Sequence, residues 1–143
     1  MDLREYTENN RKAWNAVMPH HQKVKKAEWD TNFQKPGFII QEGEELTKLG
    51  DIGIAGKDII QLCCNNGREL ISVVKRGAAS GVGFDISDEA IKEATLLGSL
   101  SGTNCEFVRT NIYDITPAYF NQFDIVYSTI GALCWFDDLQ RFF

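Results

Sequence analysis

The sequence predicts an α/β domain in which a mostly parallel sheet is covered by helices on both faces and preceded by a helical cap. From residue 58 onward, short apolar runs alternate with helical patterns, which favours parallel strands joined by crossover helices. Before residue 51, helical patterns follow one another instead. We therefore divide the 143 residues into a cap, residues 1–50, and a core, residues 51–143, which together form one folding unit.

The cap is expected to contain three helices. A helical pattern covers residues 7–18, and Pro19 is expected to end it because proline lacks the amide donor and clashes with the preceding turn. A second helix is expected over residues 20–29 and a third, short one over residues 44–49.

The core is expected to alternate four strands with three helices. The strands are predicted at residues 58–63, 81–85, 106–109 and 123–128, and the helices at residues 67–76, 88–97 and 117–121. Sheets of this kind bind ligands at the carboxyl ends of their strands, where the strand order reverses. The residues that follow each strand are therefore the candidate site.

Polar residues follow the first three predicted strands. The first strand leads into the turn "CCNNG" and then a helix, a usual place for a nucleotide-type cofactor. Asp85 ends the second strand close to the roughly 20 residues expected between such a loop and a ribose-binding carboxylate. Ile86 can pack on an adenine ring, and Asn111 can pair with its edge. The alternatives are a helix-capping or turn acid at Asp85 and a turn asparagine at Asn111.

These motifs resemble those of the class I S-adenosylmethionine-dependent methyltransferases, over residues 57–135. "IIQLCCNNG" is similar to the family's strand, acid and G-x-G-x-G loop, "GVGFDIS" to its second motif, and "FDIVYSTIGAL" to its fourth strand. The resemblance implies a Rossmann-like three-layer α/β/α fold with strand order 3-2-1-4 and S-adenosyl-L-methionine as cofactor, with no metal. It also implies cofactor binding by Gln61, Cys63, Asn65, Gly67, Asp85, Ile86, Asn111, Ile112 and Ser128, and leaves the catalytic residues unknown.

The first motif departs from the family pattern at three positions. Cys63 and Asn65 stand where the family has glycines, and Gln61 stands where it has an acid. Asparagine tolerates the left-handed backbone region and cysteine is small, so we expect the loop to keep its path, with Gly67 allowing close approach. Gln61 can still accept a hydrogen bond, but it lacks the charge that favours the cofactor's ammonium group.

Three functions remain open. The first is methyl transfer to a small molecule, since "STIG" replaces the Asn/Asp-Pro-Pro-aromatic motif of members that methylate amino groups of bases and glutamine. The second is a non-catalytic or degenerate interaction domain that binds the cofactor, as the altered first motif would allow. The third is a nucleotide-dependent oxidoreductase. Two missing glycines and Glu69 in the first helical turn disfavour it, because they suit a pyrophosphate poorly.

The cap offers further candidates. His20 and His21 are the only histidines, and either could act as a base or simply lie on a surface helix. Tyr6 and Trp14 could contact a sulfonium through cation–π interaction or pack in the cap.

The amino-acid composition limits which partners, metal sites and cellular locations are expected. The net charge is −5, and the lysines at 23, 25 and 26 are typical of a solvated helix face, so nucleic acid is disfavoured. The four cysteines have no zinc-site spacing, and disulfides are not expected. With no membrane-spanning run and no signal peptide, a cytoplasmic location is expected.

The C-terminal segment carries the last expectation. Residues 123–128 have the composition of an interior strand, yet the family's further strands beside the fourth are missing from the 143 residues. We expect a core truncated after the fourth strand that self-associates through this strand and the aromatic final helix.

Overall fold

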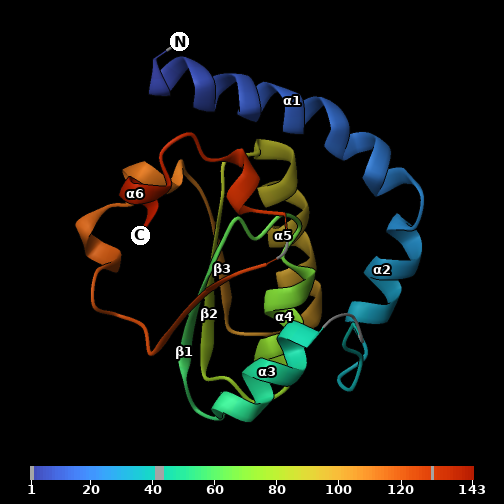
Figure 1. The fold of residues 1–143 in the computed structure, drawn as a ribbon. Coiled ribbons are helices and arrows are strands. Elements are labelled where there is room, and N and C mark those ends of the chain that lie inside the picture. Colours follow the sequence, from blue (N-terminus) through green and yellow to red (C-terminus); the bar gives the residue numbers. More distant parts are fainter. Residues whose placement is uncertain (1, 41–43, 130) are drawn as a thin grey trace.

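The computed structural model describes residues 2–40, 44–129 and 131–143, and it has the predicted four-stranded parallel sheet (Figure 1). The strands are β1 (Asp58–Leu62), β2 (Ser80–Asp85), β3 (Cys105–Arg109) and β4 (Ile125–Ser128). Their order in the sheet is β3-β2-β1-β4, as the resemblance implied. All three neighbouring pairs are parallel, so the carboxyl ends of the strands meet at one edge.

The connecting helices α4 (Arg68–Lys75) and α5 (Asp88–Ser101) lie on the same face of the sheet (Figure 1). The apolar side of α4 is buried through Leu70, Ile71 and Val73. These side chains join one apolar cluster with Ile59 of β1 and with residues of the N-terminal half, among them Phe33, Ile40 and Leu49. The predicted cap and core therefore share a hydrophobic core.

The opposite face of the sheet is covered differently from what the sequence predicted. The helix expected at residues 117–121 is only a 3₁₀ turn, Pro117–Tyr119, because Phe120 is already extended and Asn121 has a positive φ of 57°. The segment from residue 112 to 123 nevertheless buries this face. Its apolar side chains pack on Ile60, Val82 and Phe84, and they are Ile112, Ile115, Tyr119 and Phe123.

The N-terminal half begins with α1 (Leu3–Lys23) and α2 (Lys26–Phe33), followed by α3 (Glu44–Ile52). The prediction that Pro19 ends the first helix is wrong, because α1 continues through it. Contacts on both sides of the proline hold the helix together: Met18 is buried, and Gln22 Nε2 donates to the carbonyl oxygen of Glu89 at 3.2 Å. This packing offsets the one helical hydrogen bond that a proline removes.

Close packing brings the loop after β1 onto the sheet. Gly83 lies in the middle of β2, and a Cβ atom at this position would lie 2.8 Å from the Cys64 sulfur and 2.8 Å from the Phe107 ring. A side chain at position 83 would push the loop outward. The loop is therefore seated directly over the carboxyl ends of β1 and β2.

Candidate functional site

A cavity of about 470 Å³ lies at the carboxyl ends of the strands. Its floor is the segment between β1 and α4 together with Asp85 and Ile86 after β2 and Asn111 and Ile112 after β3. Its other walls come from the N-terminal helices and from the segment that follows β4. The residues of these other walls are Thr7, Asn10, Trp14, Trp29, Ile40, Thr129, Gly131, Ala132, Cys134, Trp135 and Phe136.

Six of the nine sequence-predicted binding residues line this cavity: Cys63, Asn65, Asp85, Ile86, Asn111 and Ile112. Gln61, Gly67 and Ser128 do not. Gln61 is fully buried in β1, and Ser128 is the last residue of β4. Gly67 supports the loop from below, where a Cβ atom would come within 2.5 Å of the Phe107 ring.

The loop between β1 and α4 takes the backbone path that the sequence predicted. Cys63, Asn65 and Gly67 all have positive φ values, of 59°, 50° and 73°. Glycine adopts this left-handed region freely, whereas cysteine and asparagine do so at some strain. The loop therefore keeps a glycine-like path without glycine at two of the three positions.

Asp85 holds this loop in place. Its Oδ2 accepts a hydrogen bond from the Asn65 backbone N–H at 2.8 Å, and its Oδ1 accepts one from the Ser87 N–H at 2.9 Å. Burial raises the pKa of the Asp85 carboxyl, and the backbone hydrogen bonds oppose this shift in part. The N-cap of α5 is Ser87, whose hydroxyl accepts from the Ala90 N–H, so Asp85 is not the helix cap.

Asn111 lies two residues after the end of β3, and its side chain makes a local hydrogen bond. Its Oδ1 accepts from the Tyr113 N–H at 3.2 Å and caps a short 3₁₀ turn, Ile112–Asp114. The turn role that the sequence left as an alternative is thus present. The same residue lines the cavity, so pairing with an adenine edge stays a prediction for Asn111.

The N-terminal helix closes the cavity through an aromatic contact with the C-terminal segment. The rings of Trp14 and Trp135 meet edge to face with centroids 5.2 Å apart. Asn10 Nδ2 also donates to the Trp135 carbonyl oxygen at 3.1 Å. Of the two cap aromatics that the sequence suggested, Trp14 lines the cavity and Tyr6 does not.

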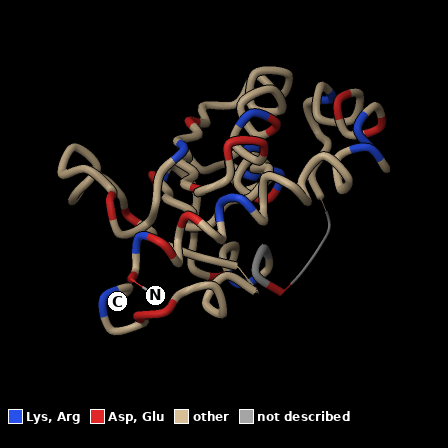
Figure 2. The backbone as a smooth tube through the Cα atoms, turned by 90° about the horizontal axis from the view of Figure 1, so that it is seen from above, with Lys and Arg blue, Asp and Glu red and all other residues tan. Residues whose placement is uncertain are grey.

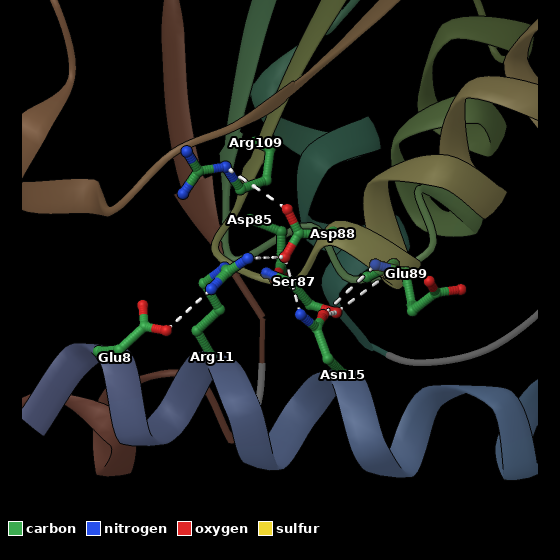
Figure 3. Close-up of polar contacts among 9 residues, drawn as sticks. Glu8, Arg11, Asn15, Asp85, Ser87, Asp88, Glu89 and Arg109 are labelled. Carbon is green, nitrogen blue, oxygen red and sulfur yellow. Dashed lines mark hydrogen bonds and ion pairs between the residues drawn. The ribbon is translucent and has the colours of Figure 1, made fainter.

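A polar cluster, which we call the latch, joins α1 to the start of α5 beside Asp85 (Figure 3). Asn15 Nδ2 donates to Asp88 Oδ2 at 2.7 Å, and the Ser87 hydroxyl donates to Asn15 Oδ1 at 2.8 Å. Arg11 lies 2.7 Å from the same Asp88 oxygen. The hydrogen bond from Asn15, followed by the charge of Arg11, lowers the pKa of Asp88. The latch is therefore strongest when Asp88 is ionised.

Neither the two thiols of the loop after β1 nor the two imidazoles supply a ready base in the cavity. Burial raises the pKa of Cys63 to about 12 and raises that of Cys64 well above its ordinary value, so both stay protonated at neutral pH. His20 and His21 are exposed on α1 and are not among the cavity residues. All four cysteines are free, as expected, and among the described residues no group of three metal-ligating side chains is clustered.

Two further observations concern the distribution of charged residues and the possibility of a membrane-spanning helix. Figure 2 shows lysine and arginine positions interspersed with aspartate and glutamate positions along the backbone. Among the helices of the described residues, none combines the length and apolar character that a bilayer crossing requires.

Of the two cavity residues in the first turn of α4, sequence reasoning named Glu69, as a residue that suits a pyrophosphate poorly, but missed Arg68. It also missed the aromatic side chains after β4 as cavity residues. The position of the α4 pair directly after Gly67 was a usable signal, because the start of this helix faces the strand ends. The path of residues 131–136 over the cavity had no comparable signal in the sequence.

Fold and cavity together define a parallel α/β domain with a candidate ligand site at the strand ends. A family profile described as "Methyltransferase domain" matches residues 59–143, more than half of the chain. The chain belongs to this methyltransferase domain family. A comparison with curated protein sequences gave no match.

Solved structures support the same fold. Magnesium protoporphyrin IX methyltransferase (ChlM) from Synechocystis PCC 6803 with bound SAM is similar with a TM-score of 0.63 and 15% identity, over 99% of this chain and 67% of that one. An S-adenosylmethionine dependent methyltransferase from Mesorhizobium loti has a TM-score of 0.58 and 24% identity, over 70% of this chain. A structure concerned with thioacetal formation in echinomycin biosynthesis has a TM-score of 0.60 and 22% identity, over 68% of this chain. The chain spans 45% and 42% of the last two structures.

Proposed function

We propose that this domain binds S-adenosyl-L-methionine and transfers its methyl group to a small molecule. The observation that carries the proposal is the cavity at the strand ends, where Asp85 and the loop after β1 face a covering helix. Membership of the methyltransferase domain family supports the reaction class. Because the chain spans less than half of two of the similar structures, the activity of the whole protein is part of the proposal.

The residues present fit this cofactor better than a dinucleotide. The cavity is lined by the carboxylates of Glu69 and Asp85, and the only cationic side chain among its described residues is Arg68. Arg68 already donates from Nε to Asn66 Oδ1 at 2.9 Å and stacks on the Trp29 ring, 4.6 Å from its centroid. A pyrophosphate would gain little here, whereas a sulfonium and an ammonium group suit an acidic site.

Each part of the cavity has a role in holding the cofactor. Asp85 would accept hydrogen bonds from ribose hydroxyls, while Ile86 and Ile112 would pack on the adenine ring. The amide nitrogen of Asn111 is available for the adenine edge, since its oxygen caps the following turn. Gln61, Gly67 and Ser128 lie behind this surface and would act by shaping the loop and the strand end.

Methyl transfer mainly requires that the acceptor be oriented toward the methyl group and that water be excluded from the site. When bound, S-adenosyl-L-methionine supplies a methyl group already activated by its sulfonium. The residues of this chain then need to align the acceptor and exclude water, which the Trp14–Trp135 contact at the mouth of the cavity favours.

A small acceptor fits the enclosure. The cavity volume lies within the range of small-molecule sites. The helix α1 crosses over the carboxyl ends of the strands (Figure 1) and lines the cavity through Thr7, Asn10 and Trp14. Among the similar proteins, one is named for magnesium protoporphyrin IX and one structure concerns echinomycin biosynthesis, and both are small molecules. A cytoplasmic location and the absence of a nucleic-acid partner stay predictions.

Thermal unfolding with three ligands tests the proposal. At 100 times its dissociation constant a ligand adds about 2.7 kcal/mol of stability, which raises the melting temperature on the order of 5–15 °C for a chain of this size. We expect this shift with S-adenosylmethionine and with its demethylated product, but not with NAD. A shift with NAD alone would favour the oxidoreductase instead.

A non-catalytic cofactor-binding domain is the second candidate. The observation that favours it is the position of both histidines on the exposed side of α1, away from the cavity. Methyl transfer from radiolabelled cofactor to a panel of small thiols, hydroxyls and carboxylates separates the two. Cofactor binding with no transfer to any acceptor would support the second candidate.

A further inference from the structure

Gln61 stands where the family's first motif has an acidic residue, but an acidic side chain, Glu69, lies next to it in α4. Gln61 is fully buried in β1, and its Nε2 donates to Glu69 Oε2 at 2.8 Å. A carboxylate can only accept, so the amide must turn its NH₂ group toward Glu69. The neutral strand residue thereby fixes the position of a charged side chain in the first turn of α4.

The charge that reaches the cavity is that of Glu69. Glu69 is one of the cavity residues and Gln61 is not. The other cavity carboxylate, Asp85, already accepts backbone hydrogen bonds through both of its oxygens. Among the described acidic residues, Glu69 is therefore the carboxylate best placed to meet a cationic ligand group at this end of the loop.

Two buried polar atoms without hydrogen-bond partners also lie at this part of the sheet, near Glu69. Gln61 Oε1 and the Tyr127 hydroxyl are buried and have no hydrogen-bond partner among the described residues. Gln61 and Tyr127 are paired in register on β1 and β4, so their side chains share one face of the sheet. Buried polar atoms without partners are rare and call for an explanation, such as a ligand or water that donates hydrogen bonds.

We propose that Glu69 supplies the counter-charge for the α-ammonium of the cofactor's amino-acid part, with Gln61 as the positioning residue that orients its carboxylate. The acid has moved from the strand to the helix, and a neutral Gln61 avoids two carboxylates side by side in a buried site. This inference rests on the proposed function, because it concerns the same cofactor.

The test compares S-adenosylmethionine and its demethylated product with 5′-methylthioadenosine, which has neither the ammonium group nor a charge on sulfur. The demethylated product keeps the ammonium group but has an uncharged sulfur. We expect Glu69→Gln to weaken binding of both S-adenosylmethionine and this product at least about tenfold, or about 1.4 kcal/mol, by calorimetry. Binding of 5′-methylthioadenosine should change less than about twofold, because the ammonium group is absent from it. The variant side chain has the same shape and can still accept the bond from Gln61.

Glu89→Gln is the matched control, since Glu89 lies in the first turn of α5 and is not a cavity residue. It removes the same charge and should leave all three affinities unchanged. Equal affinity of wild type and Glu69→Gln for S-adenosylmethionine or for its demethylated product would overturn the inference, as would an equal loss for all three ligands, which would indicate a change of loop shape. If wild type binds none of the three ligands, the proposed function itself fails.

Discussion

Asp85 both holds the loop after β1 and lines the cavity. Its two carboxylate oxygens are acceptors for the N–H groups of Asn65 and Ser87, and it lines the cavity. The sequence placed a ribose-binding acid here, and the structure adds that the same group fixes the turn after β1. A substitution at Asp85 should therefore affect stability as well as binding.

We predict that Asp85→Ala weakens S-adenosylmethionine binding at least tenfold, because the ribose hydroxyls lose a charged acceptor worth about 1.5–3 kcal/mol. It should also lower the melting temperature of the ligand-free protein, since the Asn65 N–H loses its partner. Calorimetry and thermal unfolding measure the two effects. Unchanged affinity would remove Asp85 from the site.

The titration of two carboxyls should give opposite pH dependences of stability. Burial raises the pKa of Asp85 above its ordinary 3.8, so its favourable contribution is complete below that pH and is lost as pH rises through the folded-state pKa. The pKa of Asp88 is lowered by Asn15 and Arg11, so its contribution is present above 3.8 and is lost as pH falls through the folded-state pKa.

Urea unfolding at a series of pH values checks this difference. Relative to wild type, Asp85→Asn should gain stability as pH rises from about 4 toward neutral. Asp88→Asn should instead lose stability relative to wild type as pH rises through the acid range. Parallel pH profiles for the two variants would contradict both assignments.

Gln61 shows how burial changes an expectation drawn from a motif. A neutral residue at this position suggested that Gln61→Asp would tighten cofactor binding by restoring a charge, provided that Gln61 faces the ammonium. Gln61 is instead fully buried and bonded to Glu69. An aspartate there would place two carboxylates close together away from water.

We therefore predict that Gln61→Asp lowers the melting temperature and does not tighten S-adenosylmethionine binding. The like-charge pair and the lost amide donor both destabilise the folded state, by about 1–3 kcal/mol for the donor alone. Gln61→Glu combined with Glu69→Gln should recover part of this stability, because only one carboxylate remains. A tighter cofactor complex for Gln61→Asp would show that the strand position faces the ammonium after all.

At the scale of elements, α1 is held to the core by the latch at the start of α5. Asn15 bridges Ser87 and Asp88 through its amide (Figure 3), and the Trp14–Trp135 contact lies one residue away in sequence. The helix that closes the cavity is thus tied to the segment directly after Asp85. The segment that fixes α1 is therefore the one that follows Asp85 directly.

We predict that Asn15→Ala loosens α1 without unfolding the sheet. The Asn15 side chain loses three hydrogen bonds, the longest being the one from the Glu89 N–H at 3.4 Å. A typical hydrogen bond is worth about 0.5–1.5 kcal/mol. Hydrogen exchange followed by mass spectrometry should be faster over Leu3–Lys23 and unchanged over Ser80–Asp85, with a faster cofactor dissociation rate. Lys12→Ala, an exposed position on the same helix, is the control. Uniformly faster exchange over the whole chain would mean that the latch holds the fold rather than the cap.

The elements themselves could largely be predicted from the sequence. The strands are short apolar runs ended by turn residues, and the predicted strand at residues 81–85 differs from Ser80–Asp85 by one residue. Pro19 misled the prediction because its local effect is outweighed by contacts of Met18 and Gln22, which no local pattern reports.

At the scale of the whole molecule, the sequence predicted those cavity residues whose position follows from the strand order alone. Asp85 ends β2 and Asn111 lies two residues after the end of the neighbouring strand β3, so parallel pairing brings them together. The cover of the cavity depends instead on a contact such as Asn10 with Trp135, 125 residues apart in the sequence. Such long-range contacts depend on the path of the C-terminal segment, which has no periodic pattern.

The edge of the sheet at β4 is the last feature of the whole molecule with a testable consequence. Among the described residues, β4 pairs with β1 only, and its Val126 is 63% exposed. The C-terminal segment packs over the strand ends and contacts Trp14 and Tyr113, and its Phe143 remains 88% exposed. A strand edge without proline or lysine favours pairing with another chain, and exposed aromatic side chains such as Phe143 also favour association.

We predict that the chain of 143 residues self-associates through β4 and the final helix, α6 (Leu139–Phe142), in a concentration-dependent way. Light scattering after gel filtration should give a mass above that of the 16.1 kDa monomer, rising across the micromolar range. Val126→Lys should shift the protein toward monomer, because a lysine on an edge strand opposes pairing. Val24→Lys makes the same change at a site that is 79% exposed between α1 and α2, and it should leave the mass unchanged. A heat-stable monomer at every concentration would refute association through this edge, while equal effects of both lysines would point to net charge rather than to the strand.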